Sequence, residues 1–421
     1  MSGTATAARR NGERRGYSGA MRASVIAAVC VVSGAVGAVA ALGIGGAAGW
    51  VGGTDTIVVD RTARERSDAV SAPLSTAAKP LPGRSFDPAV LYRERSAGVV
   101  TIYAFFGGTE APGENASQGS GFVVSDDGLV LTNSHVVTTA GEPGTDEVAD
   151  VRRARTVFVQ FHDGDRVAAR IVGFDPYTDV AAVKVDPADH AVAPVPLGDS
   201  ARVVVGEPVA AIGSPFGNQT SLAVGVVSAT ERSISSLTSI YNVVDAIQID
   251  APINRGNSGG PLFDARGRVI GINAQIRSES GRNEGVGFAI PINAAKRSLE
   301  QLVDKGEVSY AYVGVMTTDL TPSLAKRFGY PVRRGAVITR VTPNSPATRA
   351  GLRGGEREEE FNGITFPVGG DVIVAIDGTR VATADDVVRY VSERVDPGDV
   401  AIFTIVRDGE RERIPVRLGR R

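Results

Sequence analysis

One serine of the chain stands in a hexapeptide whose residue types suit nucleophilic chemistry, GNSGGP at positions 256–261. Glycines on both sides of Ser258 let the backbone bend sharply and direct its N–H groups toward one place. Acyl transfer needs such donors beside a hydroxyl, because they stabilise the oxyanion that forms on the attacked carbonyl. A glycine-rich turn that merely contains a serine is the alternative, and the hexapeptide alone leaves both open.

A serine hydroxyl is a weak nucleophile until a base removes its proton. The chain has three histidines, His135, His162 and His190. His135 lies in LTNSHVV (131–137), just after a predicted hairpin, where a strand can present a side chain at the edge of a site. His162 and His190 lie in polar, loop-like sequence, and we interpret them as solvated or hydrogen-bonded imidazoles. His135 is therefore the predicted base.

A third group must hold the imidazole in the right tautomer and stabilise its cation. Asp179 opens the run VAAVKV (180–185), which is typical of a buried strand. A carboxylate at the start of a buried strand costs free energy unless it is paired. A helix cap or turn acid is the alternative for Asp179. Asp175 is a weaker candidate for the third group, since an acid before proline commonly starts a turn.

Three blocks of the chain resemble the catalytic blocks of the HtrA (Deg) serine proteases: LTNSHVV (131–137), TDVAAVKV (178–185) and NRGNSGGPL (254–262). Their order, His then Asp then Ser, is that of chymotrypsin-like double β-barrels. Further stretches resemble the family in register, including QGSGFVV (118–124), AIGSPFG (211–217) and GVGFAIP (285–291). The resemblance extends over about residues 90 to 420.

The resemblance implies a role for each residue of the site. Ser258 would attack the scissile carbonyl, and His135 would act first as general base and then as general acid. Asp179 would orient His135. The backbone N–H groups of Gly256 and Ser258 would form the oxyanion hole.

The resemblance also places residues 274–277 along the primary specificity pocket. With Ala274 and Ile276 there and no acid in the segment, the expected preference is for a small or medium apolar side chain. Two positions depart from the family pattern. Arg255 stands where proline is usual, and Pro252 stands where a small residue is usual. Neither departure removes a catalytic group.

Composition excludes several other classes of function. A chain of 421 residues is too long for one ordinary domain, and its net charge of −2 does not point to nucleic acid. The single cysteine, Cys30, lies in an apolar N-terminal segment, so the remainder has no disulfide and no Cys-based metal site. Three scattered histidines do not make a zinc site either. Neither a metal nor an organic cofactor is predicted.

The N-terminal part predicts a membrane anchor. Residues 1–22 form a basic tail expected in the cytoplasm, and residues 23–53 carry no charge and are long enough to span a bilayer as a helix. A signal peptide cleaved after AVA (38–40) is the alternative. Both interpretations place the protease part of the chain outside the cytoplasm. Residues 54–88, rich in proline and polar residues, predict an extended linker.

From about residue 89 the chain consists of short β-branched runs separated by Gly, Asp and Pro, for example 99–103, 156–161 and 203–205. The predicted fold is mainly β: a chymotrypsin-like double β-barrel (89–305), which the resemblance implies, preceded by the transmembrane helix. A helix is expected after Pro291, ending near Gly306.

Residues 309–420 resemble a PDZ domain of the HtrA type, which is β-rich with two helices. Its YVGV motif (Tyr312, Val313, Gly314, Val315) matches the loop that captures a peptide C-terminus in that family. A purely structural appendage is the alternative. A helix from Ala384 is expected with Thr383 as N-cap. Residues 354–370 exceed the usual link, and their acidic stretch 356–360 is interpreted as an exposed hairpin tip.

The resemblance implies a membrane-tethered, extracytoplasmic serine endopeptidase that degrades unfolded or damaged proteins, regulated by C-terminal peptides at the PDZ domain. Its relatives assemble as trimers through the N-terminal part of the protease domain, here around residues 92–103. The loops 229–245 and 274–286 are expected to reorder on activation. Two alternatives remain: an inert chaperone or adaptor that binds protein C-termini, and a regulatory protease with one membrane-bound substrate.

Overall fold

The computed structural model describes residues 86–107, 115–140, 151–214, 220–236, 238–239, 242–254, 256–274 and 285–421. The predicted cytoplasmic tail, the membrane anchor (23–53) and nearly all of the linker lie outside these ranges. Within the ranges, none of the helices combines the length and the apolar character that a membrane crossing requires.

The first part of the described chain forms a closed six-stranded barrel with strand order β1-β2-β3-β6-β5-β4. Neighbouring strands pair antiparallel, as in β1 and β2, where Ile102 lies opposite Gly119. Ile102, Val130 and Val183 are among the fully buried side chains that fill the barrel. The strands are β1 (Val99–Phe105), β2 (Ala116–Val123), β3 (Leu129–Thr132), β4 (Thr156–Gln160), β5 (Arg166–Asp175) and β6 (Val180–Val185).

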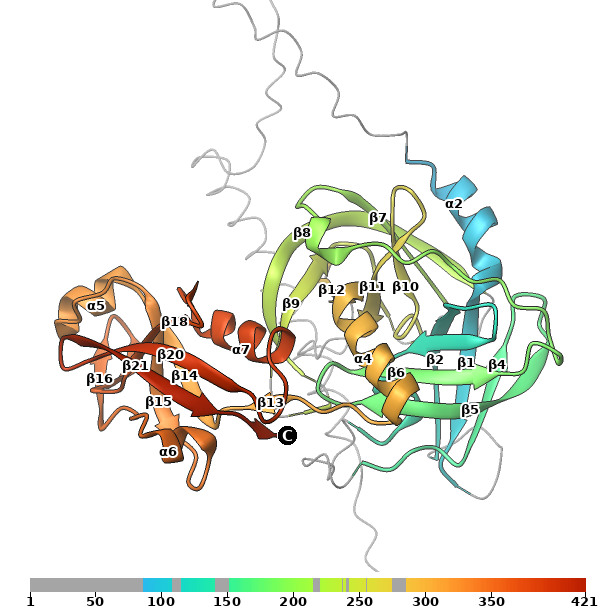
Figure 1. Ribbon diagram of the computed structural model, residues 1–421. Helices are drawn as coiled ribbons and strands as arrows, with labels where there is room; N and C mark the ends of the chain where they lie inside the picture. Colours follow the sequence, from blue (N-terminus) through green and yellow to red (C-terminus); the bar gives the residue numbers. More distant parts are fainter. Residues whose placement is uncertain are drawn as a thin grey trace, which may run out of the picture. The chain divides into compact units, whose positions relative to one another are not determined.

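A second closed barrel comes next in the chain, with strand order β10-β11-β12-β9-β8-β7, and strands β1 and β2 of the first barrel contact its strand β7 (Figure 1). Its strands are β7 (Pro208–Gly213), β8 (Ser221–Ser235), β9 (Asn242–Ile249), β10 (Pro261–Asp264), β11 (Val269–Ala274) and β12 (Gly287–Pro291). This confirms the double barrel expected from the sequence.

Few helices accompany the barrels. Helix α2 (Pro88–Arg95) begins at Asp87, whose carboxylate accepts from two backbone N–H groups of the first turn. The single turn α3 (Ser134–Val137) comes after β3, and two 3₁₀ turns are η1 (Ser96–Gly98) and η3 (Ser200–Arg202). Helix α4 (Ile292–Lys305) ends at Gly306, which takes a left-handed conformation with φ +73°, as the sequence predicts.

The C-terminal domain is built on a sheet with order β14-β15-β18-β20-β21, in which β19 also pairs with β18. Separate pairs are β13 with β22 and β16 with β17. The strands are β13 (Ala311–Tyr312), β14 (Val315–Leu320), β15 (Gly335–Val341), β16 (Arg357–Phe361), β17 (Ile364–Val368), β18 (Val372–Ile376), β19 (Thr379–Arg380), β20 (Val400–Arg407), β21 (Glu410–Arg417) and β22 (Gly419–Arg420).

This domain has three helices within the described residues, where the sequence predicts two: α5 (Pro322–Phe328), α6 (Pro346–Ala350) and α7 (Ala384–Glu393). The two short ones each begin with proline after a capping Thr321 or Ser345 and end at a left-handed glycine. In α7 the predicted N-cap is confirmed, since Thr383 and Asp386 form a reciprocal capping box.

Two local predictions were wrong. The acidic stretch 356–360 is not the tip of a hairpin but lies largely in strand β16, and the turn falls at 362–363, where Asn362 and Gly363 both have positive φ. The valines 203–205 are not a strand but a loop after η3, in which Val204 and Val205 are exposed.

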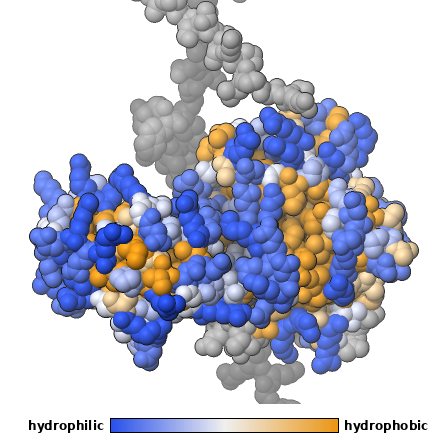
Figure 2. All heavy atoms as spheres, in the orientation of Figure 1, coloured by the Kyte–Doolittle hydropathy of each residue, from blue (hydrophilic) through white to orange (hydrophobic). Residues whose placement is uncertain are grey.

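On the face shown in Figure 2, hydrophobic side chains reach the surface over both domains, among hydrophilic ones.

Candidate active site

His135 lies in the single turn α3, which leaves the end of strand β3 and points the imidazole toward the start of strand β6. Its Nδ1 atom is 2.8 Å from Oδ2 of Asp179. The backbone N–H of His135 donates to the other carboxylate oxygen, Oδ1, at 3.0 Å. The imidazole is therefore attached to Asp179 by both its ring and its backbone.

Asp179 is itself held by the two residues that precede His135. The hydroxyl of Ser134 donates to Oδ1 of Asp179 at 2.9 Å, and the amide of Asn133 donates to the backbone oxygen of Asp179 at 2.8 Å. Sequence reasoning missed these two residues, although their position directly before the predicted base is a signal. Asp179 also has φ +57°, a left-handed conformation that non-glycine residues seldom adopt and that turns its carboxylate toward α3.

The pair is electrostatically suited to base catalysis. Burial by itself would lower the pKa of His135, but the charge and hydrogen bond of Asp179 outweigh it, so the pKa lies above its ordinary value of 6.5. Because the carboxylate accepts at Nδ1, the neutral ring carries its proton on Nδ1 and leaves Nε2 as the acceptor. Some 21% of the imidazole side chain is exposed, so the ring is not sealed from solvent.

Ser258 lies in the loop between β9 and β10 with only 4% of its surface exposed. Its hydroxyl makes no hydrogen bond within the part of the chain that the structure describes. The loop is fixed by backbone bonds, among them Asn257 N–H to Asn254 O at 3.0 Å and Gly259 N–H to Asn273 O at 2.9 Å. Gly256 takes φ +98°, a conformation that suits glycine.

The loop of Ser258 and the turn of His135 meet at Gly259. A Cβ atom on Gly259 would lie 2.3 Å from Oγ1 of Thr132 and 3.1 Å from the backbone nitrogen of Asn133. Only a residue without a side chain permits this approach. The structure thus brings together segments that are more than a hundred positions apart in the sequence.

Asp175, the weaker candidate for the acid, is not paired with the imidazole. It is fully buried and accepts from three hydroxyls: Thr178 at 2.5 Å, Ser298 at 2.7 Å and Tyr310 at 2.6 Å. The backbone N–H of Tyr177 also donates to it, at 3.0 Å. Asp175 therefore stabilises the turn that leads to Asp179 and does not pair with the imidazole of His135.

The other two histidines lie apart from His135, as predicted. His190 stacks on Phe161 with ring centroids 3.8 Å apart, and its Nε2 is 2.9 Å from Oδ2 of Asp163. The contact with Asp163 raises the pKa of His190 above its ordinary value. His162 is exposed. The described residues contain no cluster of His, Cys, Asp and Glu arranged to hold a metal ion.

The specificity pocket is only partly within the described residues. Ala274 ends strand β11 and is buried. The predicted loop 229–245 is wrong in its bounds, because residues 229–235 belong to strand β8 and residues 242–245 to strand β9, and the two strands pair with each other. Ile276 and Arg255 lie outside the described residues, as do most of the residues of loop 274–286. The predictions made for them stay predictions.

The predicted peptide-capture loop has the backbone of a tight turn. Tyr312 pairs with Gly419, and the buried Val313 accepts from the N–H of Ala347 at 2.9 Å. Gly314 has φ +85°, and a Cβ there would lie 2.2 Å from that of Ser345, so only glycine fits. Val315 then opens strand β14, the edge strand of the sheet.

Comparison with known proteins agrees with this geometry. Residues 119–272 match the model of the trypsin-like peptidase domain, and residues 311–418 match that of the PDZ domain. A probable periplasmic serine endoprotease DegP-like from Marinomonas sp. is 40% identical over 321 residues, 75% of this chain and 61% of the relative. One from Halomonas elongata is 40% identical over 306 residues, 73% of this chain and 57% of the relative.

The matched region thus spans about three fifths of the length of these curated relatives. Among solved structures, the HtrA-type protease AlgW with a tripeptide is similar with a TM-score of 0.65 and 32% identity, covering 80% of this chain and 97% of that one. The serine endoprotease from Yersinia pestis gives a TM-score of 0.55 at 26% identity. Two barrels, one PDZ domain and this degree of likeness place the chain in the family of HtrA-type serine proteases.

Proposed function

We propose that the chain is a serine endopeptidase in which Ser258 is the nucleophile, His135 the general base and acid, and Asp179 the group that orients the imidazole. The N–H groups of Gly256 and Ser258 serve as the oxyanion hole. The observation that carries the proposal is the two-point attachment of His135 to Asp179, which leaves Nε2 as the acceptor, on a turn that meets the loop of Ser258 at Gly259.

Each group has one part in the cycle. Nε2 of His135 takes the proton of Ser258 while Oγ attacks the carbonyl, and the negative charge then moves to the carbonyl oxygen facing the N–H donors. The imidazolium, stabilised by Asp179, gives its proton to the leaving amine, and an acyl-enzyme remains. Water then attacks the acyl carbonyl and gives a proton to Nε2, and the imidazolium passes this proton to Oγ of Ser258 as the ester bond breaks and the acid leaves.

The test is cleavage of unfolded casein by the full chain and by Ser258→Ala. Loss of the hydroxyl should leave at most a residual rate, about 10³–10⁴-fold above water, from the oxyanion hole and substrate binding. Ser228→Ala, at an exposed position of strand β8, is a matched control. Casein cleavage by Ser258→Ala at the wild-type rate would contradict the proposal. Full inactivity of the wild type with retained peptide binding would favour the inert adaptor.

We further propose that the C-terminal domain binds peptide C-termini at Tyr312, Val313, Gly314 and Val315. Strand β14 pairs on one side with β15, and along the described chain its other side has no strand partner. Helix α7 lies next to β14, since the N–H of Ala384 donates to Asp319 at 2.7 Å. A ligand would add a strand between β14 and α7, with its carboxylate at the turn.

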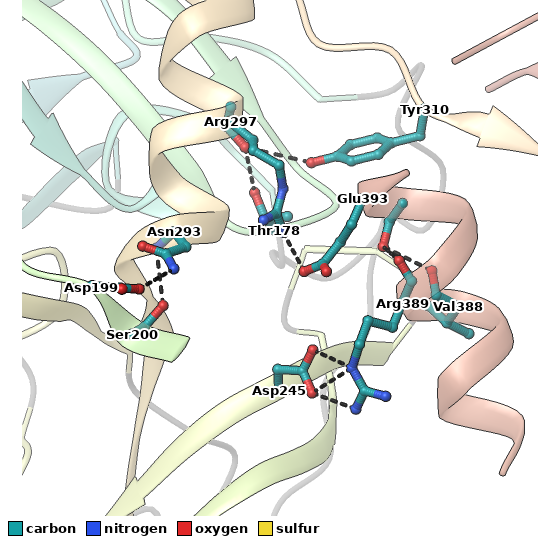
Figure 3. A network of polar contacts seen from close by, with 12 residues as sticks. Thr178, Asp199, Ser200, Asp245, Asn293, Arg297, Tyr310, Val388, Arg389 and Glu393 are labelled. Carbon is teal, nitrogen blue, oxygen red and sulfur yellow. Dashed lines mark hydrogen bonds and ion pairs between the residues drawn. The ribbon is translucent and has the colours of Figure 1, made fainter. Parts of the chain in front are cut away.

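Regulation of the protease by this domain is supported by ion pairs that join α7 to the second barrel (Figure 3). The guanidinium of Arg389 on α7 donates to both carboxylate oxygens of Asp245 on β9, at 2.8 and 2.6 Å. Nearby, Arg297 of α4 donates to Glu393 of α7 at 2.7 Å. A bidentate, part-buried pair resists displacement better than an exposed one.

The contacts continue toward the catalytic acid. Beyond strand β8, the hydroxyl of Thr238 donates to the backbone oxygen of Pro176. Pro176 belongs to the turn between Asp175 and Asp179. Strand β8, which precedes Thr238, pairs with strand β9, which carries Asp245, so the proposed route from α7 to the turn of Asp179 runs through these two strands.

Arg389→Ala tests this coupling. The ratio of casein cleavage with and without a C-terminal peptide should move toward one, since the contact through which α7 acts is lost. Arg394→Ala is a control, because this residue ends the same helix and contacts Tyr390 within its own domain. An unchanged ratio in Arg389→Ala would reject the coupling.

We also propose that residues 23–53 anchor the chain in the cell membrane with both domains outside the cytoplasm, where they degrade unfolded or damaged proteins as trimers. The uncharged segment behind a basic tail supports the anchor. The relatives' names as periplasmic endoproteases support the compartment. Alkaline extraction of membranes and sedimentation of the detergent-solubilised chain test the anchor and the trimer, and a soluble monomer would contradict both.

A further inference from the structure

Ser120 on strand β2 is fully buried and uses its polar groups to join parts of the site that come from different barrels. A buried serine without such partners would be destabilising. Its contacts reach the loop of Ser258, the end of β7 and the end of β3. The catalytic cycle described above assigns Ser120 no part.

The hydroxyl of Ser120 has a defined direction. Ser214, directly after β7, donates its backbone N–H to Oγ of Ser120 at 2.9 Å. The single hydroxyl proton is therefore free to point elsewhere, and it is donated to the backbone oxygen of Gly256 at 2.5 Å. The first barrel thus holds the loop at Gly256.

The backbone of Ser120 makes two further contacts. Its N–H donates to the backbone oxygen of Ser258 at 2.8 Å. Its own carbonyl accepts from the hydroxyl of Thr132 at 2.7 Å, at the end of the strand that leads to His135. One residue thus binds the segments that carry both the proposed nucleophile and the proposed base.

The packing around Ser120 leaves little room for these segments to shift. A Cβ on Gly259 would lie 2.2 Å from the backbone oxygen of Ser120. A Cβ on Gly213 would lie 3.0 Å from its Oγ, and one on Gly260 would lie 3.1 Å from its Cβ. The absence of a side chain at these three glycines therefore lets their backbones pack directly against Ser120.

We propose that Ser120 is a positioning residue that fixes the oxyanion-hole donors. The carbonyls that it holds, on Gly256 and Ser258, flank the peptide unit that carries the Ser258 N–H. The carbonyl of this unit itself, on Asn257, accepts from the N–H of Gly260 at 3.0 Å, so three successive carbonyls of the loop are held, two of them by Ser120. The 256–257 peptide unit, which glycine at 256 would otherwise let turn, thereby keeps its orientation next to the donor N–H of Ser258. The inference rests on the proposed function, since it assumes that this N–H meets an oxyanion.

The test compares Ser120→Ala and Ser120→Cys with the wild type in the full chain, using labelled casein and counting active sites by end-point labelling with a fluorophosphonate. Cysteine keeps a side-chain atom at the position of Oγ but donates weakly. Thr101→Val is the control, because Thr101 is the buried cross-strand neighbour of Ser120 on β1 and also loses a hydroxyl.

A misplaced oxyanion donor weakens transition-state binding more than substrate binding. Complete removal of one donor lowers kcat by about 10²–10³-fold, so kcat per active site should fall about 10- to 100-fold in Ser120→Ala. KM should stay within about twofold, and Ser120→Cys should fall in between. Thr101→Val should keep the wild-type kcat, since no side-chain hydrogen bond from Thr101 to the loop is seen along the described chain.

The outcomes separate this inference from the proposed function. A wild type that neither cleaves casein nor takes up the fluorophosphonate overturns the proposed function. An active wild type with kcat per active site unchanged in Ser120→Ala overturns the inference. If Ser120→Ala does not fold, Ser120→Cys decides: a lowered kcat at constant KM supports the inference, and an unchanged kcat overturns it.

Discussion

Replacing Tyr310 with phenylalanine removes one of the three hydroxyls that donate to the buried carboxylate of Asp175. Burial raises the pKa of Tyr310, and the neighbouring charge of Asp175 raises it further, so the hydroxyl stays protonated and donates at every physiological pH. The phenyl ring can keep the edge contact with Tyr177, at 5.6 Å between centroids. The substitution therefore keeps the ring and removes only the hydroxyl, which also has a long contact with Oγ of Ser298, at 3.5 Å.

The expected magnitude depends on the charge of the acceptor. A hydrogen bond to a charged group contributes about 1.5–3 kcal/mol, and Asp175 keeps its other donors, so no larger penalty is added. For a domain of 150–250 residues each kcal/mol lowers the melting temperature by about 2–4 °C. Tyr310→Phe should therefore lower the melting temperature of the protease domain by about 3–12 °C.

Scanning calorimetry of the full chain measures this, with every variant made in the Ser258→Ala background to prevent autolysis. Tyr312→Phe is the matched control two residues away, because no hydrogen bond of its hydroxyl is seen within the described residues. The control should change stability by less than about 0.5 kcal/mol. In an Asp175→Ala background, Tyr310→Phe should likewise cost less than about 0.5 kcal/mol.

Two results would refute the reasoning about Asp175. One is a loss in Tyr310→Phe no larger than that in Tyr312→Phe. The other is an equal loss in the presence and absence of the Asp175 carboxylate. Either would mean that the hydroxyl of Tyr310 does not stabilise the protein through Asp175.

Three further predictions concern the site and its supports. Because Asp179 raises the pKa of His135, the rise of casein cleavage with pH should have its midpoint above 6.5 in the wild type. The imidazole must be neutral to act as base, so Asp179→Asn should move this midpoint to lower pH and lower kcat by about 10⁴-fold. An unchanged midpoint would show that the rise of casein cleavage with pH reports the titration of another group. Gly259 has φ +84°, and a methyl group there would clash with the backbone of Ser120, so Gly259→Ala should lower the free energy of unfolding in urea by about 2–4 kcal/mol. Wild-type stability of this variant would mean that Gly259 and Ser120 are not in such close contact. Thr383→Ala removes the N-cap of α7 and should destabilise the C-terminal domain by about 0.5–2 kcal/mol, measured by calorimetry against Thr379→Ala on strand β19, with equal losses in both variants arguing against the cap.

The double barrel could be predicted because the catalytic blocks resemble those of the HtrA proteases, whereas the short β-branched runs alone indicated only a β-rich barrel or sandwich. Ser258, His135 and Asp179 were selected from residue types and their neighbours, and the contacts of His135 with Asp179 agree with that choice. The sequence favoured Asp179 because a strand-like run follows it, and it ranked Asp175 lower because proline follows that residue. The distinction becomes physical in the fold, where Tyr310, distant in sequence, donates to Asp175.

The features that could not be predicted depend on long-range contacts or on a single backbone angle. The role of Ser120 rests on bonds to residues 94 and 136 positions away, which no local pattern encodes. The valines at 203–205 have strong strand propensity, yet the loop after η3 leaves two of them exposed, because no neighbouring strand pairs with them there. Helices α5 and α6 are so short that their capping residues are their main signal.

The most direct test of the central claim, that His135 activates Ser258 for attack, is labelling of the full chain with a fluorophosphonate, followed by peptide mapping. One adduct per chain should form, located on Ser258, and it should be absent from Ser258→Ala. His135→Ala should slow its formation by several orders of magnitude, since the base is lost. An adduct on another residue, or one that forms on Ser258 equally fast without His135, would contradict the account.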